Sequence, residues 1–254
     1  MSLSQEQVNQ FNDQGFLPFE GMLTPLEVKA LHQRLEDIGN EVVDFPTEYV
    51  QIEPLVKTGE LLEDPVRFNN VRKIWNLTKY DSVFKELASH PKILEVVQRL
   101  LGPDLKIYVD QTLCKPPRLG SAKPPHQDSA YWTSIDPPNL VICWIALDDA
   151  TENNGCMRFI PGSHTLGVIE HKHLEDFRVE DEKIPYGREV SVPLKAGGCS
   201  FHHSLALHRT DSNPSDNRRI GLTVAYMDSH SKYVGKPPQP EYALVAGEAH
   251  KGCV

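Results

Sequence analysis

From residue 105 onward, short apolar or alternating runs follow one another, and turn-forming residues separate them. Residues 105–109 alternate between apolar and polar side chains, and 140–147 are almost continuously apolar, as in a strand buried on both faces. Further strand candidates are 156–160, 189–192, 198–203 and 220–226. The turn signals between the runs are Pro116-Pro117, Pro137-Pro138, Pro161-Gly162, Gly197-Gly198 and Asn213-Pro214. Many short strands with such punctuation are typical of a β-sandwich or barrel.

The first third of the chain carries helical signals instead. Residues 4–14 predict a helix that ends before Gly15, and 16–19 predict a short strand. Thr24 is a candidate N-cap, because Pro25 follows at the first helical position and Glu27 completes a capping box.

Two more segments complete this part of the chain. A helix is expected over 91–101, ended by Gly102, whereas 41–72 show no clean period and are expected to form a loop. Helices that precede a β half predict one α+β domain over residues 1–254.

The chain is acidic, with a formal net charge of −9 at pH 7 and no lysine or arginine run. Such a chain repels phosphate backbones and anionic lipids, which argues against nucleic acid and membrane partners. The first residues resemble no signal peptide, and no stretch approaches the roughly 20 apolar residues that span a bilayer. The five cysteines include no CxxC pair. We therefore expect a cytoplasmic protein with reduced thiols and, by default, a monomer.

A His-x-Asp motif, His126-Gln127-Asp128, is the first sign of a metal site. In an extended strand, residues i and i+2 point to the same side, so this imidazole and this carboxylate would converge on one point. Such a pair also arises by chance in many proteins. A metal site therefore needs a further ligand from elsewhere in the chain.

Segment 197–208 offers that ligand, because it contains His202, His203 and His208. Two histidines and one carboxylate on one face of a metal form the triad of non-haem iron(II) oxygenases, which leaves positions open for a co-substrate and dioxygen. His208 is the favoured third ligand. His202 and His203 remain alternatives, and strand alternation places those two on opposite faces.

Arg219 follows His208 by eleven residues. An arginine fork can hold a carboxylate through two parallel charge-assisted bonds, as the far end of 2-oxoglutarate would require. Its neighbour Arg218 is expected to face solvent or to form an ion pair. The His-x-Asp motif, the distant histidine and the arginine together form a specific combination.

Several segments resemble the phytanoyl-CoA dioxygenase family. Residues 153–164, NNGCMRFIPGSH, are similar to a signature of that family, and 13–28, DQGFLPFEGMLTPLEV, are similar to its N-terminal helix–strand–helix. The KPP and HQD motifs and the pattern H…SN.S..RR follow in the same order. The resemblance extends from about Gln5 to Tyr226, and 41–70 and the C-terminal tail match poorly.

The resemblance implies a double-stranded β-helix, which is a cupin-like jelly roll, with flanking N-terminal helices. It also implies that Fe(II) is bound by His126, Asp128 and His208, with 2-oxoglutarate and O₂ as co-substrates and ascorbate as the reductant. Arg219 and Thr210 would hold the far carboxylate of 2-oxoglutarate. The remaining residues that the resemblance places in the co-substrate pocket are Trp144, Gln127, Gln111 and Lys73.

The implied reaction converts 2-oxoglutarate to succinate and CO₂ while an unactivated C–H bond is oxidised. A carboxylate at Asp128 occupies the space that related iron halogenases leave for chloride, so hydroxylation or desaturation is favoured. The acidic chain favours a small or medium organic substrate over a CoA thioester. Two alternatives stay open: a cupin-like metal enzyme that does not use 2-oxoglutarate, and a non-catalytic binding protein on the same fold.

Overall fold

The computed structural model describes residues 3–60, 62–174 and 176–254. Helix α1 (Gln5–Gln14) begins at a Ser4–Gln7 capping box and ends at Gly15, whose φ of 82° lies in the left-handed region that favours glycine. Strand β1 (Phe16–Phe19) and helix α2 (Pro25–Gly39) follow, and the Thr24–Glu27 capping box is present. The predictions for 4–14, 16–19 and Thr24 are confirmed.

The prediction that 41–72 form only a loop is wrong in part. This stretch contains β2 (Val50–Ile52) and α3 (Pro54–Lys57), and β2 pairs with β3 (Val71–Trp75) at the edge of a sheet. Strand β2 has three residues and none of them is fully buried, so backbone pairing rather than a hydrophobic pattern defines it. Helices α4 (Leu77–Tyr80), α5 (Ser82–Ala88) and α6 (Pro91–Leu101) complete this half, and α6 confirms the prediction for 91–101.

Within the described residues, an eight-stranded antiparallel sheet has the order β1-β12-β7-β14-β4-β3-β2, and β16 also pairs with β4. Its strands from residue 105 onward are β4 (Leu105–Lys115), β7 (Leu140–Ala146), β12 (Cys199–His203), β14 (Arg219–Asp228) and β16 (Leu244–Ala246). The strand predictions in these regions are confirmed. Strands β4 and β14 extend beyond the predicted segments and pair with one another along their length.

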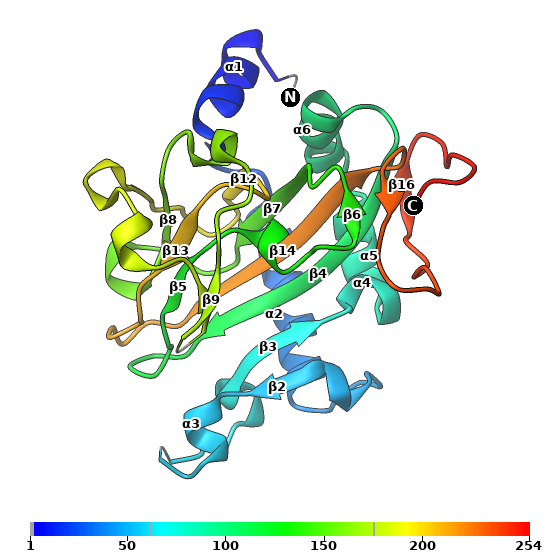
Figure 1. The fold of residues 1–254 in the computed structure, drawn as a ribbon. Helices are drawn as coiled ribbons and strands as arrows, with labels where there is room; N and C mark the ends of the chain where they lie inside the picture. Colours follow the sequence, from blue (N-terminus) through cyan, green and yellow to red (C-terminus); the bar gives the residue numbers. More distant parts are fainter. Residues whose placement is uncertain (1–2, 61, 175) are drawn as a thin grey trace.

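A smaller four-stranded sheet lies against the large one, with the order β11-β8-β13-β5 among the described residues (Figure 1). Its strands are β5 (Lys123–His126), β8 (Met157–Phe159), β11 (Val190–Val192) and β13 (His208–Thr210). Two short ribbons complete the β structure of the described residues. The ribbon of β9 (Lys172–His173) and β10 (Phe177–Arg178) lies beside β5, whereas β6 (Ile135–Asp136) with β15 (Lys232–Tyr233) packs near the ends of β7 and β14. Two facing antiparallel sheets with N-terminal helices confirm the predicted jelly-roll class.

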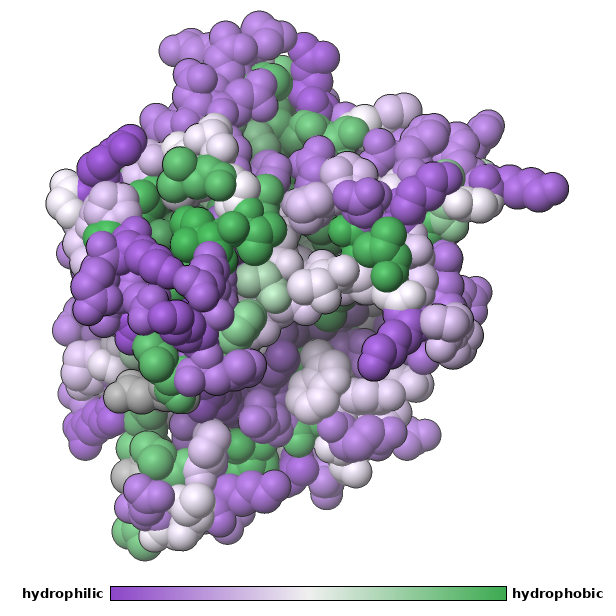
Figure 2. Space-filling view, in the orientation of Figure 1, coloured by the Kyte–Doolittle hydropathy of each residue, from purple (hydrophilic) through white to green (hydrophobic). Residues whose placement is uncertain are grey.

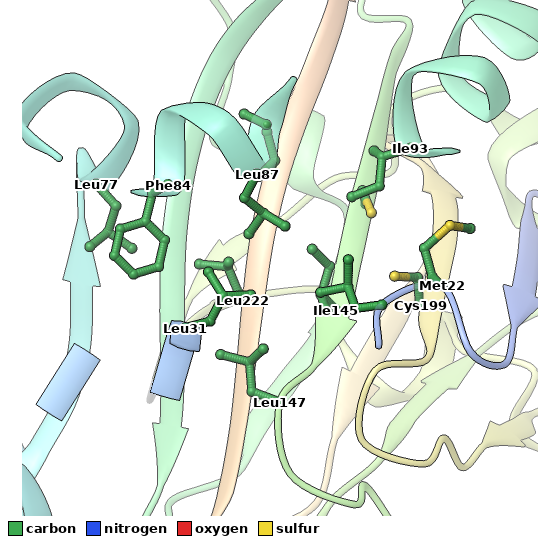
Figure 3. Packing of buried hydrophobic residues seen from close by; sticks show 14 of the residues in the cluster. Met22, Leu31, Leu77, Phe84, Leu87, Ile93, Ile145, Leu147, Cys199 and Leu222 are labelled. Carbon is green, nitrogen blue, oxygen red and sulfur yellow. The ribbon is translucent and has the colours of Figure 1, made fainter. Parts of the chain in front are cut away.

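The main hydrophobic core lies between the large sheet and the helices α2, α5 and α6 (Figure 3). Leu31 of α2 and Phe84 of α5 pack over Leu222 of β14, and Ile93 of α6 packs near Ile145 of β7. A second, smaller cluster fills part of the space between the two sheets, where the rings of Phe16 and Phe159 stack with centroids 4.6 Å apart. The rest of that space is a cavity lined by both polar and apolar side chains. No helix in the described parts of the chain is long and apolar enough to cross a membrane.

Candidate active site

His126, Asp128 and His208 come together between the two sheets. His126 ends β5, His208 begins β13, and these two residues are direct partners in the β5–β13 ladder, with ring centroids 4.2 Å apart. One possible ligand atom from each of the three residues lies within 4.8 Å of the others. Asp128 does not continue the strand as expected but begins a 3-10 turn, closed by the Tyr131 N–H that donates to the Asp128 carbonyl. The turn still presents its carboxylate to both imidazoles.

The backbone orients both imidazoles in the same way. His126 Nδ1 lies 2.8 Å from the Pro124 carbonyl oxygen, and His208 Nδ1 lies 2.9 Å from that of Ala206. Each ring therefore carries its proton on Nδ1 and presents a bare Nε2 toward Asp128. Backbone carbonyls commonly orient the histidines of metal sites through such bonds.

The protonation states fit a metal. Burial, with a contribution from His208, holds the pKa of His126 well below its ordinary value. Burial lowers the pKa of His208 to about 4. Burial alone would raise the pKa of Asp128, but the neighbouring imidazoles of His208, His202 and His126 hold it well below its usual range. Two neutral imidazoles and an ionised carboxylate are the forms that ligate a divalent metal such as iron(II).

His202 and His203 lie apart from one another, as the alternation of β12 requires. His202 is buried and its Nε2 lies 3.4 Å from Asp128 Oδ2, on the cavity side of the sheet. His203 points away, accepts the Leu205 N–H at Nδ1 and packs near His164. His202 thus supports the Asp128 carboxylate from behind, while His126 and His208 offer the open nitrogen atoms.

A cavity of about 770 Å³ opens beside these three residues, and the large sheet forms one wall. In β14, Ile220 and Leu222 pack into the helix-side core, whereas Arg219 and Thr223 line the cavity, as the two-residue period of a strand dictates. The other strands of the sheet contribute Trp144, His202, Gln111, Leu113, Lys115 and Lys73 to this wall. The small sheet contributes His126, Met157, His208 and Thr210.

Arg219 is the most unusual side chain of the cavity. It is only 1% exposed, its guanidinium lies over the Trp144 ring at 5.3 Å, and its Nε and Nη1 have no hydrogen-bond partner. Burial lowers its pKa to about 10, so it stays charged at neutral pH. Arg218 points to the opposite side and pairs with Glu36 at 3.5 Å and Asp148 at 3.6 Å, as its prediction required. A buried guanidinium with free donors facing a cavity is a ready anion site.

Lys115 is a cavity residue that the sequence did not indicate. It is 4% exposed, and its ammonium donates to the Ser121 carbonyl. Burial, then the neighbouring Arg219 and Arg72, lower its pKa to about 6. Lys73 also lines the cavity, and burial lowers its pKa as well. The cavity is therefore lined by several basic side chains, of which Arg219 is charged at neutral pH, although the chain carries a net charge of −9.

The residues predicted for the co-substrate pocket divide into two groups. Thr210, Trp144, Gln111 and Lys73 line the cavity. Gln127 does not, because consecutive residues of a strand face opposite sides and His126 faces the cavity. The Gln127 amide instead donates to the carbonyls of Gly167 and Leu205 and accepts the Ile169 N–H, and thereby holds the loop behind the metal ligands.

Tyr131 and Trp132 also line the cavity, together with an ion pair of Lys123 and Asp176 at 2.6 Å. The Lys123 ammonium lies 2.9 Å from the Tyr131 hydroxyl and 4.9 Å from the centre of its ring. Tyr131 is 40% exposed. These residues mark the solvent side of the cavity, whereas Arg219 lies at its buried end.

Comparisons with known proteins agree with this architecture. The family model of phytanoyl-CoA dioxygenase (PhyH) matches residues 11–221. The Danio rerio protein named phytanoyl-CoA dioxygenase domain-containing protein 1 is 28% identical over 268 residues, covering 90% of this chain and 91% of that protein. The peroxisomal phytanoyl-CoA dioxygenase of Rattus norvegicus is 25% identical over 244 residues, covering 91% of this chain and 70% of that protein.

Solved structures give the same result for the fold. The non-heme alpha ketoglutarate dependent carbocyclase SnoK aligns with a TM-score of 0.72 at 26% identity, covering 96% of this chain and 97% of SnoK. EctD from S. alaskensis, solved with bound Fe, aligns with a TM-score of 0.74 at 19% identity, covering 92% of this chain and 82% of EctD, and shares the fold. With the family match over most of the chain, these findings show that the chain belongs to the phytanoyl-CoA dioxygenase family and is a 2-oxoglutarate-dependent dioxygenase.

Proposed function

We propose that this enzyme hydroxylates an unactivated C–H bond of a small or medium organic metabolite and releases succinate and CO₂. Fe(II) would be held by His126, Asp128 and His208. When bound, iron would supply the redox chemistry that couples oxidation of 2-oxoglutarate by dioxygen to oxidation of the substrate. The one observation that carries the proposal is the charged, unpartnered Arg219 buried in the same cavity as the two neutral imidazoles and the carboxylate.

Each cavity residue has a role in this proposal. Arg219, helped by the hydroxyl of Thr210, would hold the far carboxylate of 2-oxoglutarate at the buried end of the cavity. Lys73 interacts electrostatically with Asp128, so its positive charge would balance the carboxylate of 2-oxoglutarate that lies nearer the metal. Trp144 would form the wall under the carbon chain and exclude water. A dianion in this position would compensate buried positive charge that the described protein residues leave unbalanced.

The substrate would enter past Tyr131 and Trp132. Trp132 also lines a neighbouring hollow of about 540 Å³ with Ile135, Val168 and Val234. Val168 is 57% and nearby Leu166 69% exposed. Figure 2 shows that apolar side chains gather in several places on a largely hydrophilic face of the molecule. An organic substrate with an apolar portion suits this entrance.

Succinate formation tests the proposal. The purified protein is incubated in air with Fe(II), ascorbate and 2-oxoglutarate, beside His126→Ala and Arg219→Ala. The matched control is Arg218→Ala, because this adjacent arginine is ion-paired outside the cavity. We expect succinate from wild type and Arg218→Ala, none from His126→Ala, and activity of Arg219→Ala only at high 2-oxoglutarate.

If 2-oxoglutarate is consumed only when the true substrate is bound, the wild-type protein will also form no succinate. Binding of Fe(II) and 2-oxoglutarate is therefore measured in parallel under anaerobic conditions. A visible charge-transfer band on adding 2-oxoglutarate to the Fe(II) protein would support the proposal. A protein that binds Fe(II) but whose spectrum ignores 2-oxoglutarate would instead be a cupin-like metal enzyme, and one that binds neither would be a binding protein on this fold.

A further inference from the structure

A second cluster of metal-ligating side chains lies outside the active-site cavity. Asp104, His230 and His250 each place a ligand atom within 4.8 Å of the others, and none of the three lines the cavity. They come from three distant segments: the turn before β4, the turn after β14 and the C-terminal tail. In Figure 1 the tail is the orange and red segment beside β16.

Protein hydrogen bonds orient two of these side chains and leave one donor atom of each directed to the cluster. The Glu248 N–H donates to Asp104 Oδ1 at 2.8 Å, and Asp104 Oδ2 forms a hydrogen bond with His250 Nε2 at 2.9 Å, which a bound ion would replace. Asp228 Oδ1 lies 2.8 Å from His230 Nδ1, so His230 Nε2 remains. A carboxylate that holds the far nitrogen of a histidine is the usual outer partner of a metal-bound imidazole.

The two imidazoles are packed face to face. The ring centroids of His230 and His250 lie 3.6 Å apart with an interplanar angle of 21°. Donor atoms that share a zinc ion at about 2.1 Å lie roughly 3.4 Å apart, and the lone pair of each nitrogen lies in the plane of its ring. The two stacked rings must therefore rotate apart before both nitrogen atoms can point at one ion. The rings are partly open to solvent, with side-chain exposures of 57% for His230 and 29% for His250, so an ion can enter and keep a water molecule.

The backbone around the cluster is built for close approach. A Cβ on Gly247 would lie 2.0 Å from Asp104 Oδ1, and the φ of Gly247 is +65°, so this residue lets the tail approach the carboxylate. The Ser229 N–H donates to the Asp104 carbonyl at 2.9 Å, and the Ser229 hydroxyl donates to the Glu248 carbonyl at 2.7 Å. All three segments are thus joined independently of the ligand atoms.

We propose that Asp104, His230 and His250 bind a divalent ion of the zinc class, with water as the fourth ligand, and that this ion clamps the C-terminal tail to the sheet. Two imidazoles and one carboxylate suit zinc in charge and ligand type. The clamp is structural and separate from the catalytic metal.

The clamped tail supports the wall of the active-site cavity. Tyr242 of the tail stacks on Tyr108 of β4 at 5.7 Å, and Tyr108 contacts Trp132, a cavity residue, at 5.3 Å. Val254 is buried against the same aromatic cluster. Zinc at the clamp should therefore protect the tail from proteolysis.

The experiment uses the full chain with the catalytic ligands removed, His126→Ala/His208→Ala, so that only the second site remains. Zinc retained after dialysis is measured together with the zinc-dependent shift in Tm. The test variant adds His230→Gln, a substitution at a side chain that is 57% exposed, and circular dichroism checks that the variant is folded. The matched control adds His173→Gln instead. His173 is also exposed, but it lies on β9, away from the cluster.

We expect one zinc per chain in the background protein and in the His173→Gln control, with a higher Tm and a tail resistant to protease when zinc is present. His230→Gln should weaken zinc binding at least tenfold and abolish both effects. Absence of retained zinc in the background protein, or equal retention by His230→Gln, would show that the cluster is only a hydrogen-bond network and would overturn the proposal.

Discussion

Lys115 and Arg219 lie directly opposite one another in the β4–β14 ladder, and both side chains enter the active-site cavity. Directly opposed residues of antiparallel strands point to the same face, so the charged Arg219 and the Lys115 amine, whose pKa is about 6, are adjacent at the buried end of the cavity. No carboxylate of the described residues forms a salt bridge with either one. We expect this pair to favour a dicarboxylate more strongly than a single arginine would.

The first prediction concerns Lys115→Met. Because the ammonium lies beside Arg219, its loss should weaken 2-oxoglutarate binding about tenfold at pH 6, the size of one charge-assisted contact. Binding of 2-oxopentanoate, which lacks the far carboxylate, should not change. Anaerobic titration of the Fe(II) protein with both acids measures this difference, and an equal loss for both acids would assign Lys115 a purely structural role.

A second prediction concerns pH. The pKa of Lys115 is about 6 without ligand, mainly because of burial and then because of Arg219 and Arg72. A bound carboxylate favours the charged ammonium and raises this pKa, so binding takes up a proton above pH 6. Affinity for 2-oxoglutarate should therefore be highest below pH 6 and fall by up to about tenfold per unit above it. In Lys115→Met, the affinity for 2-oxoglutarate should depend much less on pH in the same titration. An unchanged pH dependence would show that Lys115 is not its cause.

The third prediction concerns Gly221→Ala. A Cβ on Gly221 would lie 2.4 Å from Cζ2 of Trp144, so the indole can reach its place under Arg219 only beside glycine. The added methyl should lower the free energy of unfolding by about 1–3 kcal/mol, the usual cost of overpacking. It should also weaken 2-oxoglutarate binding, because Trp144 must move. Gly187→Ala is the control, since an added Cβ there meets no atom within 4 Å; chemical denaturation and the anaerobic titration compare the two variants.

The residues that we propose as metal ligands could be singled out from the sequence because His126 and Asp128 form a short local motif and His208 lies in a histidine-rich segment, where His202 and His203 were the alternatives. The His-x-Asp motif, His208 and Arg219 can be recognised from their order in the sequence, without knowing which strands pair or in which register. Lys115 could not be predicted in this way, since only the pairing of β4 with β14 brings it beside Arg219. The net charge of −9 also gave no sign of the positive cavity, because a sum over the chain does not record where charges lie.

The secondary structure was likewise predictable where it depends on local sequence and not where it depends on strand pairing. The α2 helix was predictable from Thr24 and Glu27, whose capping box is entirely local. Strand β2 was not, since its three residues carry too little pattern and depend on pairing with β3. The expectations of one domain, a monomer and a cytoplasmic location remain predictions.

The fourth prediction concerns His202. Its Nε2 lies 3.4 Å from Asp128 Oδ2, so it fixes the carboxylate in the orientation that faces His126 and His208. His202→Phe should weaken Fe(II) or Co(II) binding about 10–100-fold, as loss of an outer-shell partner usually does. His202→Gln should recover part of this affinity, because its amide can donate to the same oxygen. His203→Ala, on the opposite face, is the control, and equal metal affinity in His202→Phe and His203→Ala would contradict the assignment.

The fifth prediction concerns Gln127, which lies between His126 and Asp128 in sequence but is not among the residues that line the cavity. Its amide makes three bonds to the backbone of Gly167, Leu205 and Ile169. Gln127→Leu keeps the volume but removes all three bonds, at a cost of roughly 3 kcal/mol in the free energy of unfolding. Since the loop is released and the ligands are intact, protease cleavage within 163–171 should increase while the Kd for 2-oxoglutarate changes by less than about threefold. A large loss of 2-oxoglutarate affinity with an unchanged loop would instead place this amide in the co-substrate pocket.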